Sequence, residues 1–486
     1  MTQINDPKVP QAPSAIVDTS DAPDLFAHVY SRSVAGRFRT LKWQTVGVLL
    51  AIYYAVPWIR WDRGAGAPNQ AVLIDIPGAR AHIFGIEIWP QEVYYITGVM
   101  ILAALGLFLV TSMFGRLWCG YGCPQTVWTD LFLLIERRIE GDRNARIKLD
   151  SGPWSAGKLA KKLAKHAAWL LISVLTGGAF VLYFVDAPTT VPQLLTGQGS
   201  FALYACIGTL TFTTYMLAGW AREQVCTYMC PWPRIQAPML DEHSVIVSYD
   251  AARGETRGHA KKGQSFEGRG HCVDCSLCVQ VCPTGIDIRN GLQMACIGCG
   301  LCVDACNGVM ERFGLPKNLV GWTSLSVLRL PAEQRQPPKL LRPRVFIYLG
   351  LILTVLLVMG AGIASRSSLE LNVLRDRSPE FVRLSNGSVR NAFTVRVINK
   401  QRAKRDIDLR VSGLDNASLS VVGADDTGAV LHLHVGPDTV DSYRVFVTEP
   451  VIEGRPSSTQ IGFEASDASG REAARHSSVF ITRDND

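Results

Sequence analysis

The chain has 486 residues, of which 48% are hydrophobic and 19% are charged. Its length suits two or three folding units, and its composition argues against a purely soluble protein and for apolar segments that lie in lipid. The net charge of +7 would suit a nucleic-acid partner. The positions of the basic residues show whether this interpretation holds.

All thirteen cysteines lie at or before Cys306, and most of them fall in tight motifs. This pattern indicates metal ligation in a reducing compartment rather than scattered disulfides. Residues 1–42 are polar and lack the apolar core of a cleaved signal peptide, so we expect a loosely ordered cytoplasmic tail there.

Five apolar runs of about 17–22 residues are long enough to cross the ~30 Å hydrocarbon core of a bilayer as helices. The predicted spans are Trp43–Ile59, Val93–Phe114, Ala167–Val185, Phe201–Trp220 and Val345–Ile363. Buried helices of a soluble core are the alternative, but they would need partners that are apolar on every side.

The basic residues predict the orientation of these spans. The loop from Arg137 to Lys165 carries nine Lys or Arg residues, whereas Asp186–Ser200 carries none. Since cytoplasmic loops hold the excess of positive charge, we expect the N-terminus and the basic loops in the cytoplasm and everything after Ile363 in the periplasm. The charge is then a topology signal, and no nucleic-acid partner is expected.

The expected organisation has five parts. They are a tail at 1–42, a four-span membrane domain at 43–222, a cytoplasmic section at 223–344, a fifth span at 345–363 and a periplasmic β domain at 367–486.

The last part shows period-two alternation typical of a small all-β sandwich. Alternating runs occur at Leu369–Val373, Phe393–Val397 and Tyr443–Val447, and turn residues separate them at Asn386-Gly387, Ser412-Gly413 and Gly436-Pro437. His432 and His434 share one face of an expected strand, a spacing that could suit a metal, but a solvent-facing or cross-strand pair is the favoured interpretation.

Eight cysteines form a doubled CxxCxxCxxxC pattern within a ferredoxin-like insert at about 262–312. In bacterial ferredoxins three cysteines of each run hold one cubane, and the fourth reaches the other cluster. The pattern predicts two four-iron, four-sulfur clusters. The ligands would be Cys272, Cys275, Cys278 and Cys306 for cluster 1, and Cys296, Cys299, Cys302 and Cys282 for cluster 2. Structural zinc, the alternative, uses only one or two CxxC pairs.

Three glycines, Gly285, Gly298 and Gly300, suit the close approach of backbone to such clusters. Cys306 is followed by Asn307, where ferredoxins often have proline; proline shapes a turn and does not bind iron. We interpret His271 as a neighbour of the first ligand and not as a ligand.

Two CxxxCP motifs, one after the second predicted span and one after the fourth, provide four further candidate ligands: Cys119, Cys123, Cys226 and Cys230. An i, i+4 spacing puts two thiols on one helical face, and two helix hairpins would bring the four together at the cytoplasmic membrane surface. Soft thiolates select Cu(I), zinc or iron–sulfur, and Met229 and Met239 could add thioethers. Buried packing thiols or a disulfide pair are the alternatives. Cys206, inside the fourth span, is expected to pack.

Longer stretches around these motifs resemble the FixG/RdxA/CcoG family, the membrane iron–sulfur accessory proteins of cbb3-type cytochrome oxidase assembly. The matching stretches lie between Gln70 and Met310 and include Gln70–Leu73, Trp89–Glu92, Trp118–Trp128, Glu136–Gly141, Arg222–Pro231, Tyr249-Asp250, Arg253–Glu255 and the doubled ferredoxin motif. The predicted β domain agrees with the immunoglobulin-like C-terminal domain of that family.

The resemblance implies a cupric reductase of the bacterial inner membrane. Copper would bind at the four CxxxCP cysteines, with the clusters supplying the electron, and Cu(I) would pass towards the oxidase through copper chaperones or assembly factors. The electron donor is not identified, since no glycine-rich nucleotide fingerprint opens a helix.

Two other functions stay open at this point. A quinol dehydrogenase would act on quinol and need no copper, although an obvious haem-ligand pair is lacking within the spans. An assembly scaffold would bind oxidase subunits through the β domain, and its clusters would be structural.

Overall fold

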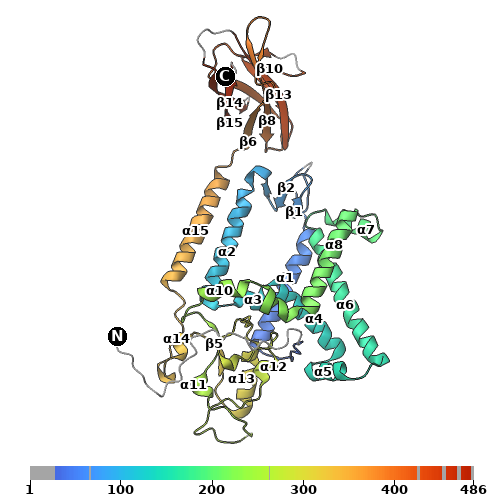
Figure 1. Ribbon diagram of the computed structural model, residues 1–486, viewed down its shortest axis with the longest axis vertical. Coiled ribbons are helices and arrows are strands. Elements are labelled where there is room, and N and C mark those ends of the chain that lie inside the picture. Colours follow the sequence, from blue (N-terminus) through green and yellow to red (C-terminus); the bar gives the residue numbers. More distant parts are fainter. Residues whose placement is uncertain are drawn as a thin grey trace. The chain divides into compact units, whose positions relative to one another are not determined.

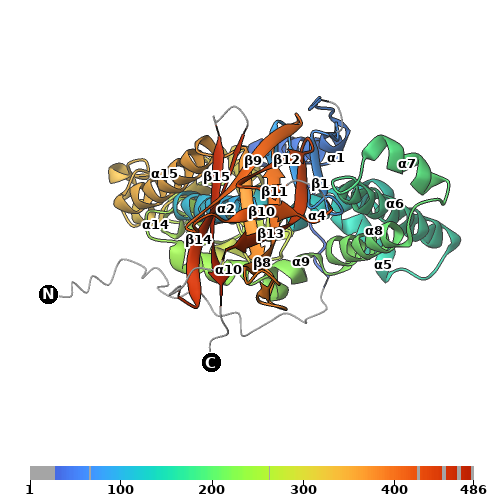
Figure 2. The same cartoon turned by 90° about the horizontal axis from the view of Figure 1, so that it is seen from above.

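The structure, a computed structural model, describes residues 28–64, 67–261, 263–423, 427–450, 456–467 and 472–482. The first 27 residues of the expected tail lie outside these ranges. The chain divides into two units, Met1–Met359 and Gly360–Asp486. The first unit is mainly helical and the second is made of strands (Figures 1 and 2).

Four helices of the described chain are long and apolar enough to cross a membrane. They are Pro90–Phe114, which contains α2 (Tyr94–Phe114), α6 (Ala156–Val181), Phe201–Trp220, which begins with α8 (Phe201–Thr214), and α15 (Pro343–Ala364). All but α6 have almost no buried residues in their most apolar stretch. Apolar side chains exposed along a whole helix are stable in lipid and costly in water, so these helices indicate a membrane protein.

The first of the five expected spans is helical but is not among these four. Helix α1 covers Arg37–Ala55 instead of Trp43–Ile59. Its first two turns carry Arg39 and Lys42, which are buried and form ion pairs with Asp130 at 3.3 and 3.0 Å. These charges lie on the same helix as the apolar run. The structure therefore identifies four of the five predicted spans, and the span predicted at Trp43–Ile59 stays a prediction.

The basic segment between the second and third predicted spans is largely helical, and the third span begins earlier than predicted. It contains α4 (Pro124–Glu140), α5 (Arg143–Ser151) and the start of α6, which begins at Ala156 and not at Ala167. The reason is that the lysines are good helix formers and find acidic partners: Lys162 and Lys165 lie 2.9 and 3.0 Å from Glu140.

Other elements had no predicted counterpart. A three-stranded antiparallel sheet is formed by β1 (Val72–Asp75), β2 (Arg80–Ile83) and β3 (Ile86–Ile88), and α7 (Ala187–Leu195) follows α6. The remaining short helices are α3 (Leu117–Tyr121), α9 (Arg222–Gln224), α10 (Trp232–Gln236), α11 (Ala251–Gly254) and α14 (Leu325–Leu328).

The cysteine-rich section is held between two paired strands, β4 (Ile246–Tyr249) and β5 (Val320–Thr323), with helices α12 (Leu277–Gln280) and α13 (Leu301–Phe313) between them. The folded section therefore extends beyond the predicted 262–312. Its hydrophobic core includes Val247, Cys272, Val303, Met310 and Val320.

The chain before α1 is tied to this section, so residues 28–42 are not the loose tail that we expected. The Arg32 backbone N–H donates to the Gln280 carbonyl at 2.7 Å. The Asp304 carboxylate accepts from the backbone N–H groups of Phe38 and Arg39, at 3.2 and 2.8 Å, and so caps the start of α1. Helix α1 and the cysteine-rich section are thus joined by hydrogen bonds.

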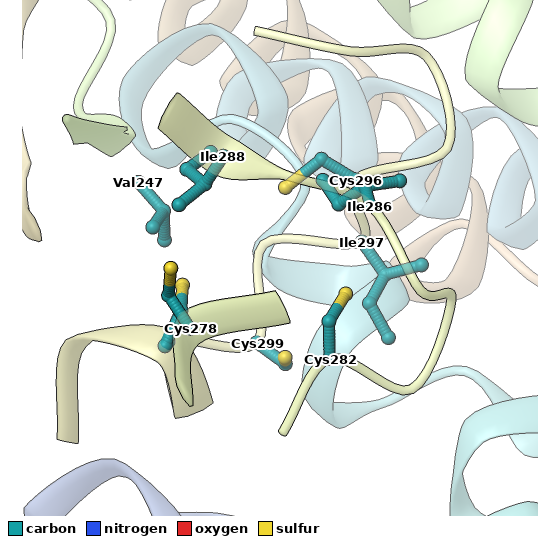
Figure 3. Close-up of a pocket in the computed structure, with 10 residues that line it drawn as sticks. Val247, Cys278, Cys282, Ile286, Ile288, Cys296, Ile297 and Cys299 are labelled. Atoms are coloured by element: carbon teal, nitrogen blue, oxygen red, sulfur yellow. The ribbon is translucent and has the colours of Figure 1, made fainter. Parts of the chain in front are cut away.

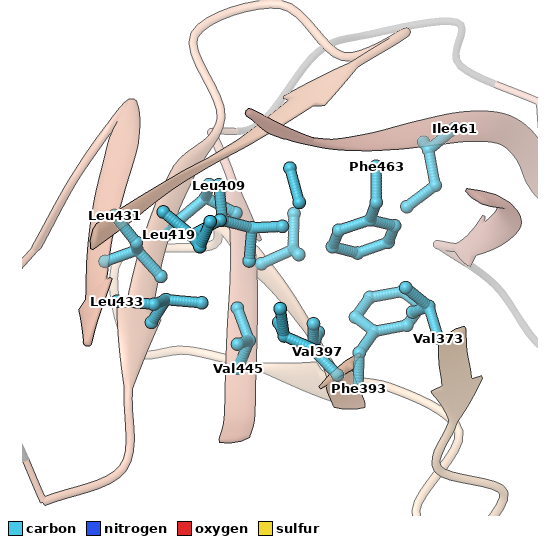
Figure 4. Close-up of a cluster of buried hydrophobic side chains, with 14 of the residues drawn as sticks. Val373, Phe393, Val397, Leu409, Leu419, Leu431, Leu433, Val445, Ile461 and Phe463 are labelled. Atoms are coloured by element: carbon cyan, nitrogen blue, oxygen red, sulfur yellow. The ribbon is translucent and has the colours of Figure 1, made fainter. Parts of the chain in front are cut away.

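The second unit contains two antiparallel sheets, with strand orders β11-β10-β13-β8-β6 (β7 also pairing with β8) and β12-β9-β14-β15. The strands are β6 (Leu369–Arg375), β7 (Val382–Arg383), β8 (Val389–Asn399), β9 (Arg405–Ser412), β10 (Ser418–Val421), β11 (Thr427–Gly428), β12 (Val430–Val435), β13 (Thr439–Glu449), β14 (Ser458–Asp467) and β15 (Ala473–Ile481). Side chains from both sheets meet in one apolar core (Figure 4). The three predicted alternating runs lie in β6, β8 and β13, as expected.

His432 and His434 form cross-strand pairs on the exposed face of β12. Their Nδ1 atoms lie 2.7 and 2.6 Å from carboxylate oxygens of Asp408 and Asp406 on β9. This agrees with the favoured interpretation of the two histidines.

We expect Phe463→Ala to destabilise the second unit by about 3–5 kcal/mol, the usual cost of removing a buried phenyl ring. Phe463 is fully buried, and its ring centroid lies 5.0 Å from that of Phe393. Hydrogen exchange of β8 and β14 in the full-length protein measures the change. Val479→Ala, at a side chain that is 41% exposed, is the control and should cost less than about 0.5 kcal/mol. Equal effects of the two substitutions would contradict the core assignment.

Candidate metal centres

The first predicted ligand set lines one cavity of about 380 Å³. We call it the first cysteine group: Cys272, Cys275, Cys278 and Cys306. Val309, Met310 and Leu319 supply an apolar wall, and Arg289 also reaches the cavity. Cys275 is exposed, whereas Cys272 and Cys278 are buried, so this group has one side near solvent.

The second predicted set lines a neighbouring cavity of about 350 Å³. This second cysteine group consists of Cys282, Cys296, Cys299 and Cys302. Figure 3 shows the sulfur atoms of Cys282, Cys296 and Cys299 turned towards a shared space beside Ile288 and Val247. Cys278 lines both cavities, so the two groups adjoin. The structure thus brings together each set of four that the spacing predicted.

Glycines allow the turns of the second group to approach their neighbours. Gly298 and Gly300 have φ angles of +66° and +73°, a left-handed conformation that side chains disfavour. A Cβ atom on Gly300 would lie 2.8 Å from the Phe38 ring. The third predicted glycine, Gly285, also has a positive φ.

The helix that contains Asn307 explains why asparagine, and not proline, follows Cys306. Helix α13 continues from Leu301 through Asn307 to Phe313, where a proline would remove a backbone hydrogen bond. The Asn307 side chain instead accepts the backbone N–H of Asn318 at 2.7 Å.

Burial makes the thiolate forms of these cysteines costly unless a metal binds. It raises the pKa of the Cys278 and Cys296 thiols to about 12 and that of Cys306 to about 11. Metal binding would supply the free energy of deprotonation. Two adjoining sets of four soft donors in apolar cavities fit two iron–sulfur clusters.

The CxxxCP cysteines are not arranged as pairs on single helices, so the i, i+4 expectation was wrong. Cys119 lies in α3, but Cys123 precedes α4 with an extended backbone (ψ 129°). Cys226 lies in a π-helical turn, Val225–Met229, and Cys230 follows it with ψ 121°. The cause is the proline after each second cysteine, which disfavours a helical backbone at the residue before it.

The four thiols nevertheless lie near one another, and we call them the cysteine quartet. Burial, together with electrostatic repulsion from Cys123 and Cys230, raises the pKa of Cys119 and of Cys226 to about 12. Within the described ranges, no three His, Cys, Asp or Glu side chains are placed to hold a single metal ion. The quartet is therefore a set of neighbouring thiols and not a closed coordination sphere.

Two further sulfur-bearing side chains are exposed. Met229 is 61% exposed. Cys206 is exposed on α8, so the prediction that it packs inside the protein was wrong.

The quartet contacts the second cysteine group. Cys119 and Cys226 pack against the cluster formed by Ile297, Cys299 and neighbouring apolar residues. The Tyr121 hydroxyl donates to the Cys299 carbonyl at 3.0 Å. A Cβ atom on Gly120 would lie 2.9 Å from the Ile297 oxygen. Helix α3 thus lies directly against the Ile297–Cys299 loop.

Sequence reasoning missed two polar residues at this junction. Gln236, which is fully buried, accepts a hydrogen bond from the Cys119 thiol at 3.4 Å and donates to Thr111 at 3.1 Å. Arg116 donates to the carbonyls of Cys296 and Pro233 at 3.1 and 3.0 Å. Arg116 could have been found from its place three residues before Cys119, whereas Gln236 had no signal in the sequence.

Three family models match the chain. Residues 96–140 match a 4Fe-4S binding domain, residues 221–325 a 4Fe-4S dicluster domain, and residues 359–483 the IG-like fold at the C-terminal of FixG. The first model covers Cys119 and Cys123, and the second covers the other two quartet cysteines and both cysteine groups.

Relatives with long alignments include the nitrogen fixation protein FixG of Rhizobium meliloti, which is 48% identical over 91% of this chain and 90% of its own. Protein RdxB of Cereibacter sphaeroides is 45% identical over 94% of this chain and 96% of its own. A crystal structure of a FixG-related protein from Vibrio parahaemolyticus is 24% identical, covers 24% of this chain and 99% of its own, and has a TM-score of 0.21. The chain belongs to the FixG/RdxA family, as the motifs around its cysteines indicated.

Proposed function

We propose that this protein is a membrane iron–sulfur oxidoreductase that reduces Cu(II) to Cu(I) and supports copper delivery during assembly of a cbb3-type cytochrome oxidase. The relatives named FixG and RdxB and the two 4Fe-4S family models support an iron–sulfur protein. The position of the quartet against the second cysteine group supports the more specific reaction.

The eight cysteines of the two groups would hold two [4Fe-4S] clusters. Cys272, Cys275, Cys278 and Cys306 would bind the first, and Cys282, Cys296, Cys299 and Cys302 the second. Such clusters supply one-electron transfer when bound. That chemistry matches the conversion of Cu(II) to Cu(I), which takes up one electron.

Copper is the substrate, and the quartet is its proposed binding place. Thiolates are soft ligands that favour Cu(I) over Cu(II), so binding at Cys119 and Cys226 would make reduction more favourable. Their contact with the Cys299 loop brings the substrate next to the second group.

The exposure of Cys275 supports delivery of electrons at the first group by a partner that is not identified. We further propose that both cysteine groups face the cytoplasm and that the second unit is periplasmic, in the bacterial inner membrane. The absence of Lys and Arg from Asp186–Ser200 supports this orientation.

We predict that anaerobically purified protein contains about eight iron atoms per chain, four for each cluster. Cys275→Ala should lower the iron content towards about four, because the first group loses a ligand and the second keeps all of its own. Iron and sulfide analysis measures this, with Cys206→Ala as the matched control. An unchanged iron content in Cys275→Ala would contradict the ligand assignment.

We expect the double variant Cys119→Ala/Cys226→Ala to lower Cu(II) reduction by more than about tenfold, since even an outer-shell partner of a metal ligand contributes that much. Its iron content should stay at the wild-type level. An anaerobic assay with a Cu(I)-specific chelator measures the rate. If the double variant loses about four iron atoms, the quartet binds iron and the copper proposal fails.

Gly120→Ala should slow Cu(II) reduction without removing iron, because the added methyl group pushes α3 away from the Ile297–Cys299 loop. Overpacking of this kind costs about 1–3 kcal/mol of stability. Gly106→Ala is the control, since a Cβ atom there meets no described atom within 4 Å. Full activity in Gly120→Ala would show that the contact between α3 and the loop does not matter for the reaction.

A further inference from the structure

Arg116 is a buried cation with no carboxylate partner within the described part of the chain. It is 6% exposed. Its guanidinium donates to the backbone carbonyls of Met294, Cys296 and Pro233, the last two at 3.1 and 3.0 Å. These carbonyl groups bind its two terminal nitrogens, while its Nε is buried without a hydrogen-bond partner. Carbonyl groups do not neutralise its charge, and an uncompensated buried charge is costly.

The groups that face this charge are thiols. Burial lowers the pKa of Arg116, and the thiols of Cys296 and Cys119 oppose that shift. Cys296 belongs to the second cysteine group and Cys119 to the quartet. Arg116 therefore lies between the two proposed metal sites, and the anions available to balance it are the ones that metal binding creates.

Other cations near the two groups have carboxylate partners. Lys42 interacts electrostatically with Cys299 and Cys226, but its Nζ lies 3.0 Å from an Asp130 oxygen. At the first group, Arg289 forms ion pairs with both Asp274 and Asp287, the latter at 2.6 Å.

Arg253, which faces Cys306, is partly exposed and interacts with Asp250. Water and that carboxylate both weaken its effect on the first group. A buried cation without a carboxylate is thus found beside the second group and not beside the first, within the residues that the structure describes.

We propose that Arg116 is the counter-charge of the second iron–sulfur site and holds its reduction potential above that of the first site. Reduction adds one negative charge to a cluster, and a nearby buried cation stabilises that charge in a medium of low dielectric constant. This difference in reduction potential favours electron flow from the first group, which lies near solvent, to the second group, which lies next to the quartet. The inference rests on the proposed iron–sulfur function and does not require copper.

The test is an anaerobic redox titration of the full-length protein, followed by low-temperature electron paramagnetic resonance. Cys275→Ala and Cys299→Ala identify the signal of each site. In Arg116→Gln we expect the reduction equilibrium of the second site to shift about tenfold towards the oxidised form, which is about 59 mV for one electron. The first site should not shift. Arg116→Lys keeps the charge and should stay near the wild-type potential.

Arg342→Gln is the control for loss of a buried guanidinium. Arg342 is 9% exposed and ion-paired with Asp241, so its removal should move neither potential.

Equal shifts at both sites, no shift, or the same shift in the Gln and Lys variants would overturn the proposal. Loss of the second site's iron in both variants would also overturn it, because the guanidinium would then be needed for assembly. Loss of the second site's iron in Arg116→Gln, with full iron content in Arg116→Lys, would support the proposal that the second site needs the positive charge. If the wild-type protein does not reduce Cu(II) although Arg116→Gln shifts the potential of the second site as expected, the proposed function fails and this inference stands.

Discussion

The contact between helix α3 and the Ile297–Cys299 loop joins the two kinds of cysteine motif in this protein. The backbone of α3 packs directly against the backbone of the loop, which leaves no room for a side chain at Gly120. The Tyr121 hydroxyl also donates to the Cys299 carbonyl. Two motifs that are far apart in the sequence thereby share one apolar cluster. The proposed copper reduction depends on this proximity, since a copper ion at Cys119 would otherwise have no electron source next to it.

Burial is the second constraint, and it acts on charges as well as on thiols. The cavity walls exclude water from the cysteines, so deprotonated thiols need either a metal or a nearby cation. The structure supplies cations at the junction from both sides. Lys42 on α1 shares the Asp130 carboxylate with Arg39, and Arg116 has no carboxylate partner among the described residues. Asp304 fixes the start of α1 on the cysteine-rich section, which keeps Lys42 in place.

The sequence predicted what depends on local spacing. Cysteine spacing identified the two groups because tight CxxCxxC turns bring their thiols together whatever the surroundings. Period-two alternation located strands such as β8 and β13, and long apolar runs located α2, α8 and α15. The glycines at Gly298 and Gly300 could be recognised because few other residues adopt their backbone conformation.

What the sequence could not give depends on contacts between distant segments. Lys162 and Lys165 on α6 form ion pairs with Glu140 on α4, and no sequence pattern shows that these two helices meet. The extended backbone of Cys123 and Cys230 is the exception, because it follows from a local signal: each is followed by a proline, which restricts the residue before it. Gln236 and Lys42 reach the quartet only through tertiary packing, and neither stands in a motif.

The central claim is that copper binds at the quartet, beside the second iron–sulfur site. Anomalous difference maps at the iron and copper absorption edges, from crystals of anaerobically purified protein loaded with Cu(I), test it most directly. We expect iron at both cysteine groups and copper beside Cys119 and Cys226, closer to the second group than to the first. Iron at the quartet, or copper bound only elsewhere on the chain, would contradict the claim.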